Sequence, residues 1–194
     1  SKRDKEPLSE RHLDELQAHN ILHLDAQEDP WIMAVFWMCR CSTLGIKEAS
    51  GLAAEDIVLD HTVPHVIVRP NRFRDLKTSN RERVFPLAGE ALWRAKQLAA
   101  TNPVDGKSMS NKFNRLIGKI TSQRTKKQTF NSFRHNWKDW LVQAGANSDE
   151  LKYLMGHANH DITDNYGTSE ADLKRLHSLV HRVLNEIHVQ SFFA

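Results

Sequence analysis

The sequence predicts a mostly α-helical domain that carries a small three-stranded antiparallel β-sheet. Apolar residues recur at helical spacing in most segments of the 194-residue chain. Between these segments lie three short runs that are rich in β-branched residues, which is typical of strands. Hydrophobic residues make up 40% of the chain and charged residues 26%, a composition that fits one globular domain of this length.

The chain is expected to open with a loose charged lead-in, residues 1–7, followed by two helices. Ser9 can cap the first helix, which continues to about His23. Asp29 and Pro30 are typical of the cap and first turn of the second helix. The following sequence, WIMAVFWMCRC, is apolar on nearly every side, so this helix should lie at the centre of the core.

A short helix from about Ile46 to Leu52 leads into the predicted sheet. The segments DIVLDH, PHVIVRP and RVFPL have the alternation and the β-branched residues of strands. The connection before the last of them, NRFRDLKTSNRE, is polar and basic. We therefore expect an antiparallel sheet with a basic loop at one end.

Helices are expected to fill most of the rest of the chain. One covers about residues 89–100, and another shows apolar residues at helical spacing between 113 and 120. A third begins at about Asn131 and is stopped by Gly145, and a short fourth helix ends at Gly156.

The last helix should begin at Ser169 and continue to about Ile187. Its apolar positions step by three and four residues, at Leu173, Leu176, Val180, Val183 and Ile187. The tail, residues 188–194, ends in SFFA. This apolar stripe and the tail can fold back onto their own domain, or they can dock head to tail on a neighbouring protomer. The sequence leaves both possibilities open.

Cysteine usage and hydropathy indicate a cytoplasmic protein without membrane contact. Cys39 and Cys41 are two residues apart on a predicted helix, so they point to different faces and suit no disulfide. We expect inert buried thiols in a reducing compartment. No signal peptide is visible, and no apolar run is long enough to span a bilayer. The net charge of +3 is small, so the placement of basic residues matters more than their sum.

The segment from Thr129 to Tyr166 carries the residues that point most clearly to chemistry. It holds Arg134 in NSFRH, His157 in LMGH, and Tyr166 nine residues after that histidine. Metal-free cleavage of a phosphodiester needs a nucleophile, positive charge on the phosphate oxygens and an acid for the leaving oxygen. Tyrosine can be the nucleophile, and the planar fork of arginine suits a phosphate. Each residue alone has an ordinary structural reading, but their order and spacing together favour the functional one.

This segment resembles the active-site block of the tyrosine recombinases, the family of the phage integrases. The family reads H-S-L-R-H, then L-G-H, then a tyrosine nine residues later, and here Asn131 takes the place of the first histidine. Upstream, LGIKEASGLAAEDIVLD is similar to the family's TGARLSEIAGLRVEDID, and LKTSNRERVFPL is similar to its lysine-bearing hairpin. The resemblance covers about residues 40–167. It implies the fold of the C-terminal catalytic domain over residues 8–187, with no separate N-terminal core-binding domain visible.

The resemblance also implies site-specific DNA recombination. Tyr166 would attack a DNA phosphate and hold the 3′ end as a phosphotyrosine, while Lys77 would protonate the leaving 5′ oxygen. Arg134, His157 and Asn131 would stabilise the charge on the phosphate. This chemistry needs no metal and no nucleotide cofactor, and it implies double-stranded DNA and further copies of the chain as partners.

Basic residues in the sheet loops and before the motif are expected to form one DNA-binding face around Arg134. They are Arg72, Arg74, Lys77, Arg81, Arg83, Arg124, Lys126 and Lys127.

One departure from the family pattern motivates a second hypothesis. Gly45 stands where the family has its first catalytic arginine, and Arg40 and Lys47 lie nearby, out of register. Loss of one preorganised charge typically slows a reaction by about 10²–10³-fold. Together with Asn131, Gly45 therefore suggests an alternative, a cleavage-deficient DNA-binding protein on a recombinase scaffold.

A third class, a metal hydrolase, would use His157, His160 and Asp161. Their H-x-x-H-D spacing in a turn differs from that of zinc sites, in which two histidines lie one helical turn apart with a third ligand. We therefore expect no metal site.

Overall fold

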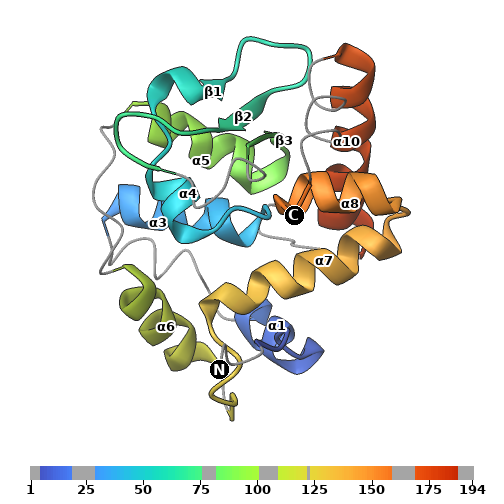
Figure 1. Cartoon of the computed structure of the whole chain (residues 1–194). Coiled ribbons are helices and arrows are strands. Elements are labelled where there is room, and N and C mark those ends of the chain that lie inside the picture. Colours follow the sequence, from blue (N-terminus) through green and yellow to red (C-terminus); the bar gives the residue numbers. More distant parts are fainter. Residues whose placement is uncertain are drawn as a thin grey trace.

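The computed structural model describes residues 5–18, 29–75, 82–100, 109–121, 123–158 and 169–187. Most of these residues are helical, and a three-stranded antiparallel sheet lies at one end of the helical body (Figure 1). The predicted fold class is confirmed.

Helix α3 (Pro30–Arg40) forms the centre of the core. Every residue from Met33 to Arg40 is buried, and α5 (Gly89–Ala99) packs against this helix. The side chain of Asp29 caps α3, because its Oδ1 accepts a backbone N–H of the first turn at 2.8 Å. The helix start and the central position are both as the sequence predicted.

The sheet consists of β1 (Ile57–Val58), β2 (His65–Val68) and β3 (Arg83–Pro86), in the order β1-β2-β3. Val66 fixes the register, since it lies opposite Ile57 of β1 and Phe85 of β3. All three of these side chains are buried. The short elements α4 (Ile46–Ser50) and η1 (Ala54–Asp56) connect α3 to the sheet.

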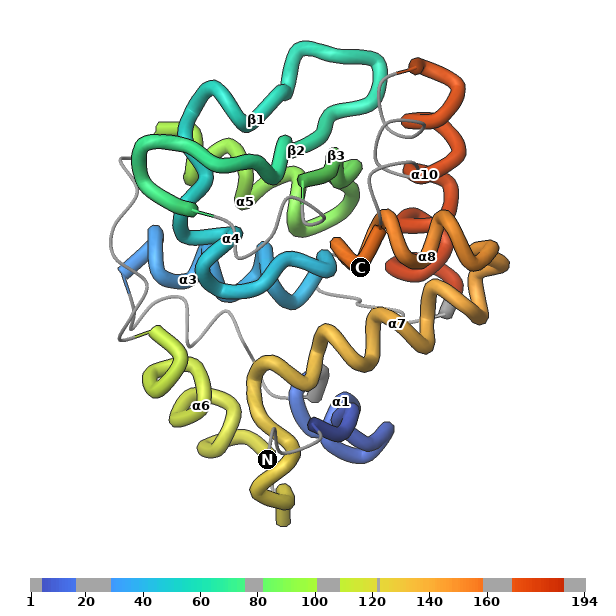
Figure 2. Tube along the Cα trace, viewed as in Figure 1, coloured from blue at the N-terminus to red at the C-terminus, as the bar shows by residue number. Residues whose placement is uncertain are grey.

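Helices α1 (Glu10–Ala18) and α6 (Met109–Ile120) lie at the other end of the molecule (Figure 2). The turn η4 (Phe130–Ser132) joins this end to the next helix. The ring of Phe130 lies 4.7 Å from that of Phe113 on α6 and 5.0 Å from that of Phe36 on α3, measured between centroids. This aromatic contact holds the start of the predicted motif against the core.

Helix α7 (Phe133–Gln143) ends before Gly145, which has a φ of 94° and provides the predicted stop. Helix α8 (Ser148–Met155) follows at once, and the side chain of Asn147 caps it by accepting the backbone N–H of Glu150 at 2.8 Å.

The C-terminal helix, α10 (Glu170–Arg182), continues into a π-helical turn, η5 (Val183–Ile187). Its predicted cap is confirmed, because Ser169 Oγ accepts the backbone N–H of Asp172 at 3.1 Å. The stripe residues Leu173, Leu176, Val180 and Val183 are at most 4% exposed, and the helix packs on β3 while η5 packs on α7. These four residues therefore face their own domain, so the prediction that the stripe docks on a neighbouring protomer is wrong for them. Residues 188–194 lie outside the described part of the chain.

The two cysteines are buried, as predicted. Burial raises the pKa of the Cys39 thiol and raises that of Cys41 to about 12. Both thiols are therefore protonated and unreactive at neutral pH.

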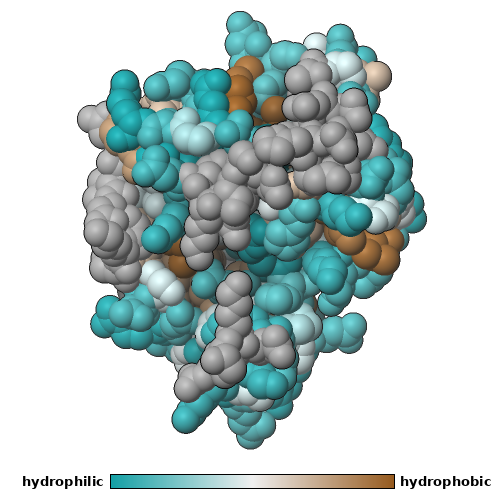
Figure 3. All heavy atoms as spheres, in the orientation of Figure 1, coloured by the Kyte–Doolittle hydropathy of each residue, from teal (hydrophilic) through white to brown (hydrophobic). Residues whose placement is uncertain are grey.

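The face of the molecule shown in Figure 3 is largely hydrophilic, with small separate apolar patches. In the described ranges, the large hydrophobic side chains classed as exposed are Phe73, Trp93 and Val142. No helix among the described residues combines the length and the apolar character that crossing a bilayer requires.

Candidate active site

Arg134 lies on the first turn of α7 and points towards a loop and a helix end that are distant from it in the sequence. Its Nη1 donates to the Thr43 carbonyl at 2.7 Å, and its Nη2 donates to the Met155 carbonyl at the end of α8. The Nη1 atom also lies 3.6 Å from Oε2 of Glu48. The side chain remains 18% exposed, so one buried helix end, one loop and one carboxylate hold a guanidinium that still reaches the surface.

Glu48 is a buried carboxylate on α4, and Arg83 of β3 pairs with both of its oxygens. Arg83 Nη1 donates to Oε1 at 3.1 Å and Nη2 donates to Oε2 at 3.0 Å. Burial alone would raise the pKa of the Glu48 carboxyl. The charge and the hydrogen bonds of Arg83 outweigh that effect, with help from Arg134, and the pKa falls to about 2. Glu48 is therefore ionised at neutral pH although it lies in the interior.

Two of the predicted DNA-binding residues are buried, and we correct their assignment. Arg83 has no exposed side-chain surface and makes the Glu48 ion pair. Arg74 is 8% exposed, and its guanidinium donates to the carbonyls of Glu48 and Arg69. Both arginines bind internal acceptors, so neither side chain lies on the surface that DNA would meet.

His157 follows directly on the end of α8. Gly156 has a φ of 71° there, and the backbone N–H of His157 donates to the Lys152 carbonyl at 2.8 Å, which closes the helix with a left-handed turn. The histidine is exposed, two residues beyond the Met155 carbonyl that Arg134 binds. The contact between Arg134 and the helix end thus brings the two predicted residues into one region.

Gly45, Asn131 and Arg134 line one small cavity at the surface, together with apolar side chains. Gly45 has an ordinary extended backbone, with φ of −77° and ψ of 165°, so its conformation does not require glycine. A Cβ atom built on it would come no closer than 3.9 Å to another group, Oε2 of Glu48. A Cβ atom can therefore be added at this position without a clash.

Neither neighbour that the sequence offered as a substitute cation lines this cavity. Arg40 is buried, and its guanidinium lies 4.6 Å from the ring centroid of Phe133 and 5.5 Å from that of Trp140. Burial lowers its pKa to about 10, which still leaves it charged at neutral pH. Lys47 is exposed and also lies outside the cavity lining.

The remaining predicted DNA-binding residues that the structure describes reach the surface to different degrees. Arg72, with 68% of its side chain exposed, lies beside exposed Phe73. Lys126 and Lys127 are exposed, and Lys127 Nζ pairs with Glu6 at 3.1 Å. Arg124 is half-buried and donates to the Gln128 carbonyl at 3.0 Å.

The sequence reasoning missed a basic ridge on α6. Lys112, Arg115 and Lys119 surround a small surface hollow next to Leu116. Their spacing of three and four residues was a visible signal, because it places them on one face of the helix.

Three of the predicted site residues, Tyr166, Lys77 and Arg81, lie outside the described part of the chain.

Tyr153, the only other tyrosine in the sequence, is 2% exposed. Its hydroxyl accepts the backbone N–H of Val84 in β3 at 2.8 Å. Tyr153 therefore has a structural function and is not available as an alternative nucleophile.

Among the residues that the structure describes, no group of three or more histidine, cysteine, aspartate or glutamate side chains could hold a metal ion. His160 and Asp161, two members of the hypothetical metal set, are outside that part of the chain.

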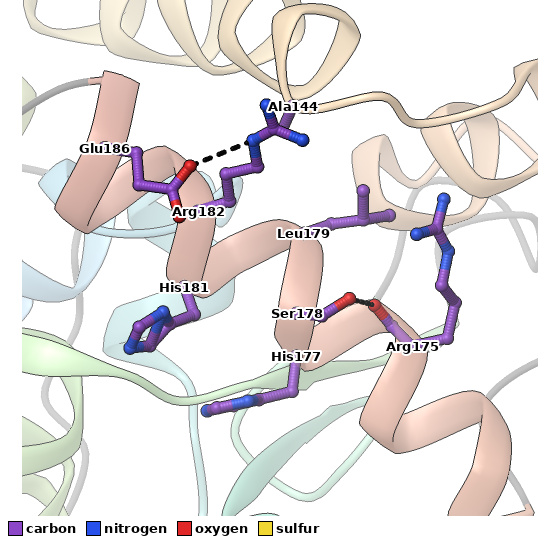
Figure 4. A pocket seen from close by; sticks show the side chains of 8 residues that line it. All are labelled: Ala144, Arg175, His177, Ser178, Leu179, His181, Arg182 and Glu186. Carbon is purple, nitrogen blue, oxygen red and sulfur yellow. Dashed lines mark hydrogen bonds and ion pairs between the residues drawn. The ribbon is translucent and has the colours of Figure 1, made fainter.

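A separate pocket on α10 and η5 contains none of the predicted site residues (Figure 4). It reaches Ala144, at the opposite end of α7 from Arg134. Several of its charged side chains are engaged with other groups, since Arg182 pairs with Glu186 at 3.1 Å and Arg175 with Glu150 at 2.9 Å. Both arginines of this pocket are therefore already held by carboxylates.

Comparison with known proteins decides the family. A family model described as "Phage integrase family" matches residues 11–172. The chain belongs to the phage integrase family. This match includes both described residues of the motif, Arg134 and His157, and also the position of Tyr166. A comparison with curated protein sequences gives no match.

Solved structures of the Tn1549 transposon integrase have a similar fold. One, in complex with transposon right end DNA, has 22% identity and a TM-score of 0.53, and the match covers 87% of this chain and 64% of that one. Another, in complex with circular intermediate DNA, has 19% identity and a TM-score of 0.51, with 87% and 65% covered. This member of the phage integrase family thus spans less than two thirds of the length of those integrase chains.

The depressed pKa of Glu48 predicts an acid-sensitive fold. The carboxyl has an ordinary pKa of 4.5 and one of about 2 in the folded chain. It should therefore contribute about 3 kcal/mol above pH 5, and this contribution should be lost as the pH falls from about 5 to about 2. Urea unfolding over this range should show a smaller pH dependence for Glu48→Gln than for the unaltered chain. Glu55→Gln, which changes an exposed carboxyl, should keep the pH dependence of the unaltered chain. If Glu48→Gln also kept it, the acid sensitivity would come from other groups.

Proposed function

We propose that residues 8–187 form the catalytic domain of a site-specific DNA recombinase that cleaves and rejoins DNA through a 3′-phosphotyrosyl intermediate. The observation that carries this proposal is the position of Arg134. Its guanidinium lines a surface cavity with Asn131 and also binds the helix end that leads to His157. Family membership supports the same reaction.

The proposed reaction exchanges one ester bond for another. The phenolic oxygen of Tyr166 attacks the phosphorus, and the bond from phosphorus to the 5′ oxygen breaks. Arg134 donates hydrogen bonds to the non-bridging oxygens, with His157 and Asn131 beside it. Lys77 gives a proton to the 5′ oxygen. Attack by a 5′ hydroxyl of another strand restores the DNA and frees the tyrosine, so no nucleotide cofactor is consumed.

Double-stranded DNA is the proposed partner, because the similar Tn1549 integrase structures contain transposon DNA. Strand exchange joins two duplexes, so we also propose that several copies of the chain assemble on the DNA. Basic side chains that reach the surface are the proposed phosphate contacts. They are Arg72, Arg115, Lys119, Lys126 and Lys127, with Lys112 and Arg124 partly exposed and with Lys77 and Arg81 added from the sequence.

A second candidate function follows from Gly45, because the described residues that line the cavity beside Arg134 include no second cationic side chain. Here the chain binds recombination-type DNA but does not cleave it. Both candidates use the same surface, so the covalent step distinguishes them.

Tyr166→Phe should abolish the covalent adduct and leave DNA binding nearly intact, because the nucleophilic oxygen is lost while the ring is kept. The protein is incubated with nicked suicide DNA in EDTA, and the adduct is resolved on a denaturing gel. An adduct that persists in the variant would exclude Tyr166 as the nucleophile. Binding without any adduct from the unaltered chain would favour the cleavage-deficient alternative, and activity only after metal addition would favour a hydrolase.

Gly45→Arg should raise single-turnover cleavage at least roughly tenfold, since it adds a preorganised charge beside Arg134. The backbone conformation at this position suits any residue, and a Cβ atom there meets no clash. Gly45→Met, an uncharged side chain of similar length, should give no gain. If a folded Gly45→Arg variant cleaves no faster, the register with the family arginine is misread or another group already supplies the charge.

DNA binding should be salt-sensitive, and the slope of log K against log salt should fall by about one for each phosphate contact removed. Lys126→Ala and Arg115→Ala test the two basic regions by fluorescence anisotropy over a salt series. Lys174→Ala removes an exposed lysine on α10 that pairs with Glu170, and it should leave the slope unchanged. If every variant kept the salt slope of the unaltered chain, these residues would make no contact with the DNA phosphates.

A further inference from the structure

Strand β3 is tied to the end of α8 by two neighbouring residues. Arg83 Nε donates to the Leu154 carbonyl at 3.0 Å, and the backbone N–H of Val84 donates to the Tyr153 hydroxyl at 2.8 Å. The last carbonyls of a helix have no partner within the helix, and cations are favourable there. Arg83 thus binds the helix end at the residue just before the carbonyl that Arg134 uses.

Arg83 and Arg134 share their acceptors. Both guanidinium groups donate to the Thr43 carbonyl, at 3.4 Å and 2.7 Å respectively. Both lie near the same carboxylate oxygen of Glu48, but at different distances. Arg83 Nη2 is 3.0 Å from that oxygen, within hydrogen-bonding range, whereas Arg134 Nη1 is 3.6 Å away.

The difference in distance has a consequence for Arg134. Because Arg83 occupies both oxygens of Glu48, the carboxylate attracts Arg134 without forming a close ion pair with it. A buried carboxylate that lost Arg83 would need another partner. Arg134 is the next cation at hand, and a close ion pair with Glu48 would draw its donors away from the cavity that it shares with Asn131.

We propose that Arg83 is a positioning residue for the proposed cleavage reaction. It satisfies Glu48 so that Arg134 keeps its guanidinium at the cavity, and it fixes the end of α8 from which His157 emerges. This inference rests on the proposed function and adds a residue that never touches the DNA.

The test compares Arg83→Met with Arg94→Met. Arg94 forms a similar buried ion pair with Glu90 at 2.7 Å, on α5, outside the cavity lining, so it controls for the general loss of a buried pair. Arg83→Met should slow adduct formation at saturating DNA at least roughly tenfold and keep the DNA dissociation constant within about twofold. Arg94→Met should change neither quantity in the folded protein. Wild-type rates for folded Arg83→Met, or a loss of affinity that accounts for the slower reaction, would overturn the proposal.

A double-mutant cycle separates positioning from a merely structural effect. If Arg83 acts through Arg134, replacing Arg83 should slow adduct formation little further in an Arg134→Lys background. A merely structural effect should instead multiply with the loss of rate that Arg134→Lys causes. If Arg83→Met does not fold, Arg83→Lys is used in its place, because a lysine keeps a cation in the interior but cannot pair with both oxygens of Glu48 as the arginine fork does. Folded Arg83→Lys should form the adduct at least roughly threefold more slowly with unchanged DNA affinity, and a wild-type rate would overturn the proposal.

One measurement decides the proposal even if the chain forms no adduct. The Nε–H resonance of Arg134 in the DNA-free protein should shift in Arg83→Met, because a close ion pair with Glu48 changes its surroundings, and it should stay in place in Arg94→Met. An unshifted resonance in folded Arg83→Met would overturn the positioning mechanism. Absence of an adduct from the unaltered chain would instead count against the proposed function.

Discussion

The site depends on the interactions of the Glu48 carboxylate with Arg83 and Arg134. The carboxylate is a charge in the interior of the protein, and it can remain ionised there because Arg83 and Arg134 approach it from two different elements. Those arginines belong to β3 and α7, and both also bind carbonyls at the end of α8. One small helix, one strand and two longer helices therefore meet at a single charge. Removing one partner of such a buried group typically costs about 3–5 kcal/mol, so the same contacts that shape the site also hold the fold together.

Local signals in the sequence predicted most elements of the fold. Asp29 with Pro30, Gly145 and Gly156 mark helix ends through their own backbone and capping chemistry, which needs no knowledge of the rest of the chain. The contacts within the site were harder to predict from the sequence. Arg83 and Arg74 looked like solvated loop cations, because their acceptors are up to 71 residues away and no periodic pattern reports such a contact. The apolar stripe of α10 had the same limitation, since spacing shows a buried face but not what buries it.

Gly45 illustrates how structure and sequence complement one another. The sequence identified it only as a departure from a family pattern. In the structure its backbone is ordinary, a Cβ atom would meet no clash, and the glycine lines a small cavity together with Arg134. The glycine is therefore no requirement of the local fold.

The hydrogen bond between Tyr153 and Val84 also bears on the solubility of the protein. In the sheet that the structure describes, β3 is an edge strand. An edge strand presents unpaired N–H and C=O groups that can recruit a strand from another molecule. Here the N–H of Val84 is already occupied by a side chain from α8, and Arg83 beside it is drawn inward. The contact that organises the site therefore also occupies the N–H at the middle of β3 with which a strand of another molecule could otherwise pair.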